Sequence, residues 1–248
     1  MGSVLGSGAA AVVLAVSVWQ TAFLPVVGLC AITMTMLHSW SHEQYVLHRI
    51  RLDLTGTVRR VFGNRHQRLL IVAYCLFVLT WQGVAAFLPS FLRSTKGFSP
   101  TFASGGFALV FLVGMVVMPV SGALSDRFRR LRVAIVALVI ELCGLSGLLL
   151  ARSVPGILGS IAVFAAGLMA YPPVMQAYLM DWYSSETMGG DFGAFKTVYS
   201  GVGGFGPVVA GFVASIASYG IAFTGLACIL SLCLLILGWF TLTVSTRD

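Results

Sequence analysis

Gly122-Ala-Leu-Ser-Asp-Arg-Phe-Arg-Arg-Leu-Arg132 is a short charged stretch between two long apolar runs. The chain has only 15 basic and 8 acidic residues, and five of them fall within this stretch. The flanking runs, 101–121 and 133–151, are each close to the roughly 20 residues that a helix needs to cross a bilayer. Short basic turns between such helices face the cytoplasm. The stretch therefore predicts a cytoplasmic hairpin between two membrane-spanning helices.

The composition of the whole chain indicates that lipid surrounds it. The 248 residues are 58% hydrophobic and 9% charged, with a mean hydropathy of +0.95. A soluble domain carries about 25% charged residues, so this chain cannot cover a globular surface with polar groups. Helices satisfy their own backbone hydrogen bonds in lipid. The predicted fold class is therefore all-α, a polytopic bundle of membrane helices.

Other classes of protein are disfavoured by the same sequence. The net charge of +7 does not predict nucleic-acid binding, because the basic residues lie in loops between apolar runs. The five cysteines lie inside apolar runs without paired spacing, which argues against a disulfide framework or a metal site. His42-Glu43 with His48 lacks the spacing of a zinc-protease motif. We therefore expect no cofactor, no metal and no nucleic-acid partner.

Eight apolar runs can span a membrane, and the basic residues orient them. Twelve Lys and Arg residues fall on the side that carries both termini and the loop 38–68, and three fall on the other side. Basic loops stay in the cytoplasm. The sequence thus predicts a multi-pass protein of the cell membrane with both termini cytoplasmic. The predicted spans are 3–18, 20–37, 69–92, 101–121, 133–151, 155–178, 194–217 and 220–243.

The loop from His38 to Arg68 is the one long connection among these spans. Within it, Leu52–Phe62 could form a helix lying on the membrane surface, since apolar Leu52, Leu54, Val58 and Val61 are combined with basic Arg51, Arg59 and Arg60. A basic tether that only fixes topology explains the same residues equally well.

Two motifs resemble those of a known family. The spacing of Gly122, Asp126-Arg127 and Arg129-Arg130 resembles the G-x-x-x-D-R-x-G-R/K-R/K signature of the major facilitator superfamily, with Arg129 in place of the second glycine. The run from Gly203 through Gly206-Pro207 to Gly211 resembles that family's glycine-proline motif. Tyr219–Phe223 also follows Trp19–Phe23 at an offset of 200 residues, as in the parallel repeat that relates the two halves of such transporters.

The resemblance implies helices five to twelve of a twelve-helix transporter. Residues 1–38 would be the last two helices of the N-terminal half, 39–68 the linker between the halves, and 69–248 the six-helix C-terminal half. Four helices of the usual twelve would precede them. This predicts a fragment, a truncated chain, or one part of a two-piece transporter whose partner supplies those helices. The implied function is secondary transport of a small solute by alternating access, and the alternative is a membrane protein that no longer transports.

By the same resemblance, Gly122 would be a point of close helix packing. Asp126 would be an electrostatic latch that closes one face, with Arg127 and Arg130 as its cationic partners. An anchor that only fixes topology remains the alternative. The glycine-proline residues Gly203, Gly206, Pro207 and Gly211 would form a packing motif, although glycine-rich faces occur in many tightly packed membrane helices.

Polar residues inside the spans are the candidates for chemistry. Glu141 lies nine residues beyond Arg132, so about 13 Å into a hydrocarbon core about 30 Å thick. It is either a proton-coupling carboxyl or a neutral group that hydrogen-bonds a neighbouring helix. On the spans that resemble the cavity-lining helices, the candidate cavity residues are Trp81, Gln82, Tyr171 and Gln176. Packing between helices is the alternative role for them.

An enzyme is the remaining class to consider. Gly144-Leu145-Ser146-Gly147 matches the G-x-S-G of rhomboid-type proteases, but a nucleophilic serine needs a base within hydrogen-bond reach. All four histidines lie in the cytoplasmic loop, whereas Ser146 lies toward the outer face. The sequence therefore predicts that the protein is not an enzyme.

Overall fold

The computed structural model describes residues 24–40, 54–184 and 186–245. The chain divides into two units, Met1–Leu52 and Asp53–Asp248, and each is described by itself. In the first unit, the described element is helix α2, Leu24–Trp40, which overlaps the predicted span 20–37. The predicted span 3–18 lies outside the described residues. The second unit contains part of the predicted linker 39–68, and the assignment of the domains to two transporter halves stays a prediction.

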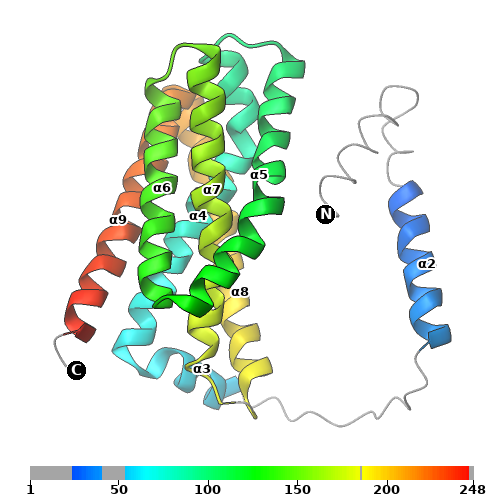
Figure 1. Ribbon diagram of the computed structural model, residues 1–248, viewed down its shortest axis with the longest axis vertical. Helices are drawn as coiled ribbons and strands as arrows, with labels where there is room; N and C mark the ends of the chain where they lie inside the picture. Colours follow the sequence, from blue (N-terminus) through cyan, green and yellow to red (C-terminus); the bar gives the residue numbers. More distant parts are fainter. Residues whose placement is uncertain (1–23, 41–53, 185, 246–248) are drawn as a thin grey trace. The chain divides into compact units, whose positions relative to one another are not determined.

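The second unit is a bundle of long helices with one short helix at its end (Figure 1). Six of the helices in the described part of the chain are long and apolar enough to cross a membrane. Every described element is helical, so the predicted all-α membrane bundle is confirmed. The elements are α3 Leu54–Gly63, α4 Arg65–Ser94, α5 Pro100–Arg127, α6 Arg130–Leu150, α7 Val154–Met180, α8 Met188–Ile216 and α9 Tyr219–Ser245.

The helices extend beyond the predicted apolar spans, mostly at their charged ends. Helix α5 continues six residues past the predicted end at 121, to Arg127, and α8 begins at Met188 rather than at 194. Hydropathy detects only the part of a helix that lies in hydrocarbon. Charged side chains continue the helix outside that region, where their heads reach water.

Local sequence signals explain where the helices begin and end. Ser99 caps α5 by accepting a hydrogen bond from the backbone N–H of Phe102 at 3.3 Å, with Pro100 following as the first helical residue. Ser153 begins α7 in the same way, and Asn64 caps α4. At the end of α6, Lys96 donates hydrogen bonds to the carbonyls of Leu149 (2.9 Å) and Ala151 (2.7 Å).

Lys96 thus ties the α4–α5 loop to the last turn of α6, where cations stabilise the helix dipole. Its ammonium group also lies 5.6 Å from the centre of the Phe91 ring. Partial burial, followed by repulsion from Arg152, lowers the pKa of Lys96 below its usual value.

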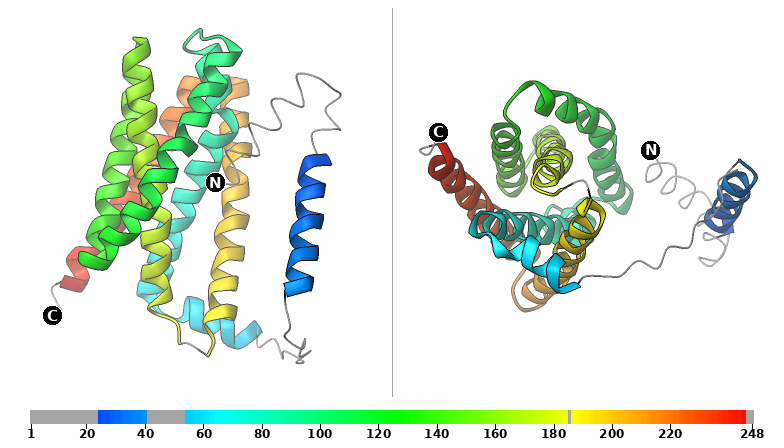
Figure 2. Two further views of the ribbon diagram at one scale, coloured as in Figure 1. Left: turned by 45° about the vertical axis from the view of Figure 1, so that its right-hand side comes forward. Right: turned by 90° about the horizontal axis from the view of Figure 1, so that it is seen from below.

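Two close helix pairs build the bundle. Helix α6 packs along α7, and α4 packs along α8, while α9 lies against α4 and α6 (Figure 2). Glycines permit both close pairs. A Cβ atom at Gly144 of α6 would lie 2.1 Å from the backbone nitrogen of Phe164 in α7, so the two backbones are in contact there. Small residues allow this approach in membrane proteins, where packing replaces the hydrophobic effect.

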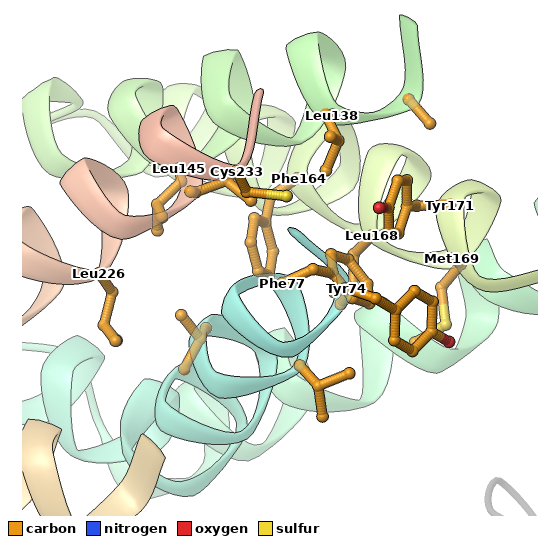
Figure 3. Close-up of a cluster of buried hydrophobic side chains, with 14 of the residues drawn as sticks. Tyr74, Phe77, Leu138, Leu145, Phe164, Leu168, Met169, Tyr171, Leu226 and Cys233 are labelled. Carbon is orange, nitrogen blue, oxygen red and sulfur yellow. The ribbon is translucent and has the colours of Figure 1, made fainter. Parts of the chain in front are cut away.

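Aromatic rings fill the interior between these pairs. Figure 3 shows Tyr74 and Phe77 of α4 facing Phe164 and Tyr171 of α7. The rings of Phe77 and Tyr171 lie 4.4 Å apart. By contrast, only 17% of the most apolar 18-residue stretch of α5 is buried, and the same share of α8, against 56% in α4. The bundle therefore leaves the outer sides of α5 and α8 apolar and uncovered within this unit.

Candidate functional site

The two ends of the bundle differ in charge. Helix α3, the α5–α6 turn and the α7–α8 loop lie at one end, and the 95–99 and 151–153 loops lie at the other (Figure 1). Among the described residues, nine Lys and Arg fall toward the first end and three, Arg93, Lys96 and Arg152, toward the second. We call the first end the basic end. Its nine are Arg59, Arg60, Arg65, Arg68, Arg127, Arg129, Arg130, Arg132 and Lys196.

The signature hairpin lies at the basic end, and its residues have different surroundings. A Cβ atom at Gly122 would meet no atom within 4 Å among the described residues, so Gly122 is not a packing point inside this unit. Asp126 and Arg127 are exposed and have no ion-pair partner in the described part of the chain. The latch therefore stays a prediction, since any partner of Asp126 would have to come from elsewhere.

Arg130 has a partner that the sequence did not suggest. Its guanidinium forms an ion pair with Asp181, at the end of α7, and donates to the carbonyl of Ala177 at 3.0 Å. The pair ties the start of α6 to the end of α7. A sequence signal did exist, because Asp181 is the first acidic residue after a long apolar run and is expected on the same side of the bundle as the arginine-rich turn.

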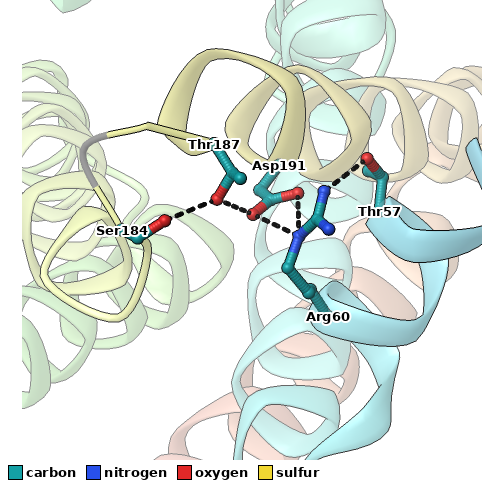
Figure 4. Close-up of polar contacts among 5 residues, drawn as sticks. All are labelled: Thr57, Arg60, Ser184, Thr187 and Asp191. Atoms are coloured by element: carbon teal, nitrogen blue, oxygen red, sulfur yellow. Dashed lines mark hydrogen bonds and ion pairs between the residues drawn. The ribbon is translucent and has the colours of Figure 1, made fainter. Parts of the chain in front are cut away.

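A second polar network joins α3 to the start of α8 (Figure 4). The Asp191 side chain is 1% exposed, and both of its carboxylate oxygens lie 3.1 Å from Nε of Arg60. Thr187 donates to Asp191 at 2.7 Å, and Arg60 donates to the Thr57 hydroxyl at 3.1 Å. Burial, followed by the nearby Asp191 carboxylate, raises the pKa of Tyr183 to about 12. The segment predicted as an interfacial helix or a tether is thus a helix, and it is fastened to α8.

Asp191→Asn is expected to loosen this attachment of α3. The amide keeps the shape but removes the charge that holds Arg60, and a hydrogen bond to a charged group contributes about 1.5–3 kcal/mol. Because the Arg60 side chain is 41% exposed, solvent screening reduces the expected loss to about 1 kcal/mol. Thermal unfolding in detergent should show a Tm lower by about 2–4 °C. Glu186→Gln, at an exposed acidic residue of the same loop, is the matched control, and equal Tm values would contradict the network's role.

Glu141 lies in the interior, halfway along α6. Its side chain is 0% exposed, and neither carboxyl oxygen has a hydrogen-bond partner among the described residues. The carboxyl lies within electrostatic reach of the Tyr171 hydroxyl and the Cys233 thiol. Gly167 of α7 covers the Glu141 backbone so closely that a Cβ atom there would lie 2.2 Å from the Glu141 nitrogen. An ionised carboxylate without a partner is very costly in such surroundings.

The predicted cavity residues fall into two groups, one on α7 in contact with Tyr74 and one on α4. Gln176 donates a hydrogen bond of 2.7 Å to the Tyr74 hydroxyl, and Tyr171 stacks on Tyr74 with ring centres 5.8 Å apart. Tyr171 is fully buried, so it can contact a solute only if α7 moves. Gln82 is exposed and Trp81 is partly buried against Phe111, with ring centres 6.4 Å apart.

Tyr74 is a residue that the sequence analysis missed. It connects Gln176 and Tyr171 of α7 with Phe195 and Tyr199 of α8, whose rings lie 5.1 Å and 4.9 Å from its own. Its only sequence signal was a polar hydroxyl eight residues before Gln82, which is about 12 Å along the same helix.

The glycine-proline residues lie where α8 meets α4. A Cβ atom at Gly206 would be 2.2 Å from the carbonyl oxygen of Leu79, and one at Gly203 would be 2.5 Å from Cγ1 of Val78. A Cβ atom at Gly211 would lie 3.0 Å from Cζ of Phe87, and Pro207 lies inside α8. The backbones of the two helices are therefore in direct contact at Gly206.

Comparison with known proteins assigns the family. The sequence profile of the Major Facilitator Superfamily matches residues 1–154 and again residues 70–248. The chain belongs to the major facilitator superfamily. The stretch 70–154 falls in both matches, as expected for a family whose halves are repeats of one another. The major facilitator superfamily comprises transporters, which supports the prediction that this protein is not an enzyme.

Solved structures of two transporters share the fold of this chain. One is the POT family transporter PepTSo, solved in meso, with a TM-score of 0.60 and 16% identity over 71% of this chain and 37% of that one. Another is the E310Q mutant of a peptide transporter POT in complex with sulfate, with a TM-score of 0.63 and 18% identity over 73% and 37%. This chain thus spans little more than a third of their length. Among curated protein sequences, none matches it.

Proposed function

We propose that the protein is a secondary active transporter that moves a small solute across the membrane by alternating access. The observation that carries this proposal is the match to the superfamily over the whole chain, together with a six-helix unit that shares the fold of the POT transporters. Secondary transporters of this kind work by rocking one repeat against the other around a site near the bilayer midplane.

The proposed orientation places both termini in the cytoplasm. Its support is the excess of nine over three basic residues at the basic end, because loops rich in Lys and Arg remain cytoplasmic. The ion pairs Arg60–Asp191 and Arg130–Asp181 would then lie at the cytoplasmic surface, where they hold the loops of one rocking unit together.

The proposed solute site includes Gln82 and Trp81 of α4 and Gln176 of α7. Gln82 is exposed on a helix that is otherwise well buried, which leaves its amide available for hydrogen bonds. Gln176 is partly exposed, and its amide keeps donors and acceptors beyond its bond to the buried Tyr74 hydroxyl that can bind polar solute groups. The solved structures that share this fold are POT family transporters, and one of them is named a peptide transporter. Short peptides are therefore the first solute class to test.

We also propose Glu141 as the group that couples transport to protons. Support comes from its complete burial and from its two oxygens, which have no hydrogen-bond partner in the described part of the chain, since ionisable groups at such depth are generally functional. Tyr171 lies close to it on α7, so movement of α7 would change the surroundings of the carboxyl. The alternative is a purely structural carboxyl.

A second candidate function is one part of a two-piece transporter. The chain covers 37% of the solved transporters, and the outer sides of α5 and α8 are apolar and uncovered within the six-helix unit. Large apolar side chains on these sides include Val116, 66% exposed, and Phe212, 64% exposed. A partner chain with the remaining helices would cover some of these surfaces, and lipid would cover the rest.

The test is transport by the full chain reconstituted into vesicles with an inward proton gradient. Di- and tripeptides, amino acids, sugars and organic cations would be screened as separate classes, with empty vesicles as the control. We expect uptake of at least one class above the empty-vesicle level. No flux of any class would contradict transport by this chain alone. Flux that appears only after co-reconstitution with a chain carrying the other helices would support the two-piece function.

A further inference from the structure

Two buried polar side chains in the interior of the six-helix unit lack hydrogen-bond partners. Among the described residues, four buried side-chain oxygens make no hydrogen bond, and three of them belong to Glu141 of α6 and Tyr171 of α7. Both residues are 0% exposed. Buried polar groups without partners are rare in folded proteins, so each calls for a physical reason. Two of them in one region point to a partnership that forms in another state of the protein.

The packing of α6 on α7 brings the two side chains to the same level. A Cβ atom at Gly167 of α7 would lie 2.2 Å from the Glu141 nitrogen and 2.5 Å from the carbonyl oxygen of Ala137, so α7 passes directly over this turn of α6. Tyr171 follows Gly167 by four residues, which places it one turn further along the same face of α7. The two helices are antiparallel, and side chains lean toward the N-terminus of their own helix. The Glu141 carboxyl therefore leans toward the turn that carries Tyr171.

The helices packed on α6 bring few titratable groups to this carboxyl. The Cys233 thiol of α9 lies near it, but that proton is already used, since the thiol donates to a backbone carbonyl of α4 at 3.0 Å. Figure 3 shows the Tyr171 hydroxyl on the side of its ring that faces Cys233. Helix α5 carries titratable side chains only at its end, in Asp126 and Arg127. Among the described residues near Glu141, Tyr171 is thus the side-chain donor whose proton is unused.

Tyr171 also contacts a residue of the proposed solute site. Its ring stacks on Tyr74, whose hydroxyl accepts a hydrogen bond of 2.7 Å from Gln176. The pair Pro172-Pro173 separates Tyr171 from Gln176 along α7, and prolines remove the backbone donors of two helical hydrogen bonds. Helices bend at such points. A solute bound at Gln176 can therefore shift Tyr171 relative to the carboxyl on α6.

We propose that Tyr171 is the positioning residue for the coupling carboxyl, and that its hydroxyl donates a hydrogen bond to Glu141 once Glu141 has released its proton to water. This role rests on the coupling function proposed for Glu141. A carboxylate in hydrocarbon surroundings needs a donor, whereas a neutral carboxyl tolerates burial better. The arrangement with three unpartnered oxygens corresponds to the protonated state. Bending of α7 would bring the hydroxyl to the carboxylate, which ties proton release to the solute contact at Gln176.

Infrared difference spectroscopy of the full chain in detergent measures the protonation of Glu141 without any solute. The band of its protonated carboxyl is identified by its absence from Glu141→Gln, and the loss of the band with rising pH gives the pH of half-ionisation. Tyr171→Phe keeps the ring and removes the hydroxyl. Losing a hydrogen bond to a charged group is expected to move half-ionisation upward by about 1–2 pH units.

Two control variants locate the donor. Tyr199→Phe removes another hydroxyl of the same aromatic cluster, and Cys233→Ala removes the thiol whose proton α4 already accepts. Both should keep the wild-type pH of half-ionisation. An unshifted value in Tyr171→Phe would overturn the role of Tyr171, and a shift in Cys233→Ala alone would assign the donor to the thiol instead. A Glu141 band that persists at every pH in the wild type would also overturn it, because no carboxylate would then form.

A second readout requires no change at Tyr171, so it does not depend on the folding of that variant. In the wild type, ionisation of Glu141 should shift a tyrosine C–O band, and this shift should vanish in Glu141→Gln. Its presence in both proteins would contradict the hydrogen bond. Transport distinguishes this role from the coupling function itself. Solute accumulation that survives Glu141→Gln would contradict coupling by Glu141, whereas an unshifted spectrum beside lost accumulation would contradict only the role of Tyr171.

Discussion

Gly206→Ala is expected to destabilise the six-helix unit severely, whereas Gly204→Ala, two residues earlier on the same helix, is expected to be tolerated. A Cβ atom at position 206 would lie 2.2 Å from the carbonyl oxygen of Leu79 and 2.9 Å from the nitrogen of Gly83. Both are backbone atoms of α4, so no rotamer change can make room. Helices α4 and α8 would have to separate along their whole contact.

The expected cost follows from overpacking. Inserting a methyl group into a well-packed core costs typically 1–3 kcal/mol, and a clash with backbone belongs at the upper end of that range. At Gly204 a Cβ atom meets nothing within 4 Å, and alanine also gains about 1 kcal/mol of helix propensity over glycine. The two variants share that gain, so the difference between them measures the clash, at about 3 kcal/mol.

Thermal unfolding of the two purified variants in detergent provides the measurement. For a chain of this size, about 3 kcal/mol corresponds to a Tm difference of about 6–12 °C, with Gly204→Ala the more stable. Gly203→Ala, which would bring Cβ to 2.5 Å from a side-chain methyl of Val78 and not from backbone, should fall between the two. Equal Tm values for the Gly204 and Gly206 variants would show that α4 and α8 are not in backbone contact.

This pair of glycines also shows how far the sequence could predict the fold. Hydropathy located the spans, because lipid requires long apolar helices, and the glycine-rich run indicated close packing of α8. The resemblance to the glycine-proline motif selected Gly206 and not Gly204 from this run, but it could not show which helix Gly206 contacts. That depends on the rotation of α8 about its axis, which is set by contacts with α4 and α9.

Polar partners were predictable only in part, for a related reason. Arg130 belongs to a recognisable motif, but its partner Asp181 lies 51 residues away and comes close only because α6 and α7 are antiparallel neighbours. Asp191 and Arg60 lie 131 residues apart and meet through the docking of α3 on α8. Glu141 could be identified as a candidate from sequence alone, because an acidic residue inside an apolar run is unusual whatever its neighbours in the fold are.

Glu141→Gln is expected to abolish proton-driven accumulation while leaving the fold intact. An amide has nearly the shape of a protonated carboxyl, so the close packing of α6 against Gly167 of α7 can be kept. It cannot release a proton, however. With one proton moved for each solute, a gradient of one pH unit supports about tenfold accumulation, and an uncoupled carrier supports none. Counterflow exchange of labelled for unlabelled solute needs no net proton movement and should persist.

Stability measurements separate the coupling role from a structural one. Both oxygens of Glu141 are buried and have no hydrogen-bond partner among the described residues, so Glu141→Leu is expected to raise the Tm by removing polar atoms that gain nothing from this unit's fold. If Glu141 had only a structural role, Glu141→Leu would instead lower the Tm, and Glu141→Gln would accumulate solute as the wild type does. Glu186→Gln, at an exposed acid outside the spans, is the matched control and should accumulate solute normally. A stabilised leucine variant that exchanges but does not accumulate would identify Glu141 as a residue retained for proton coupling at the expense of stability.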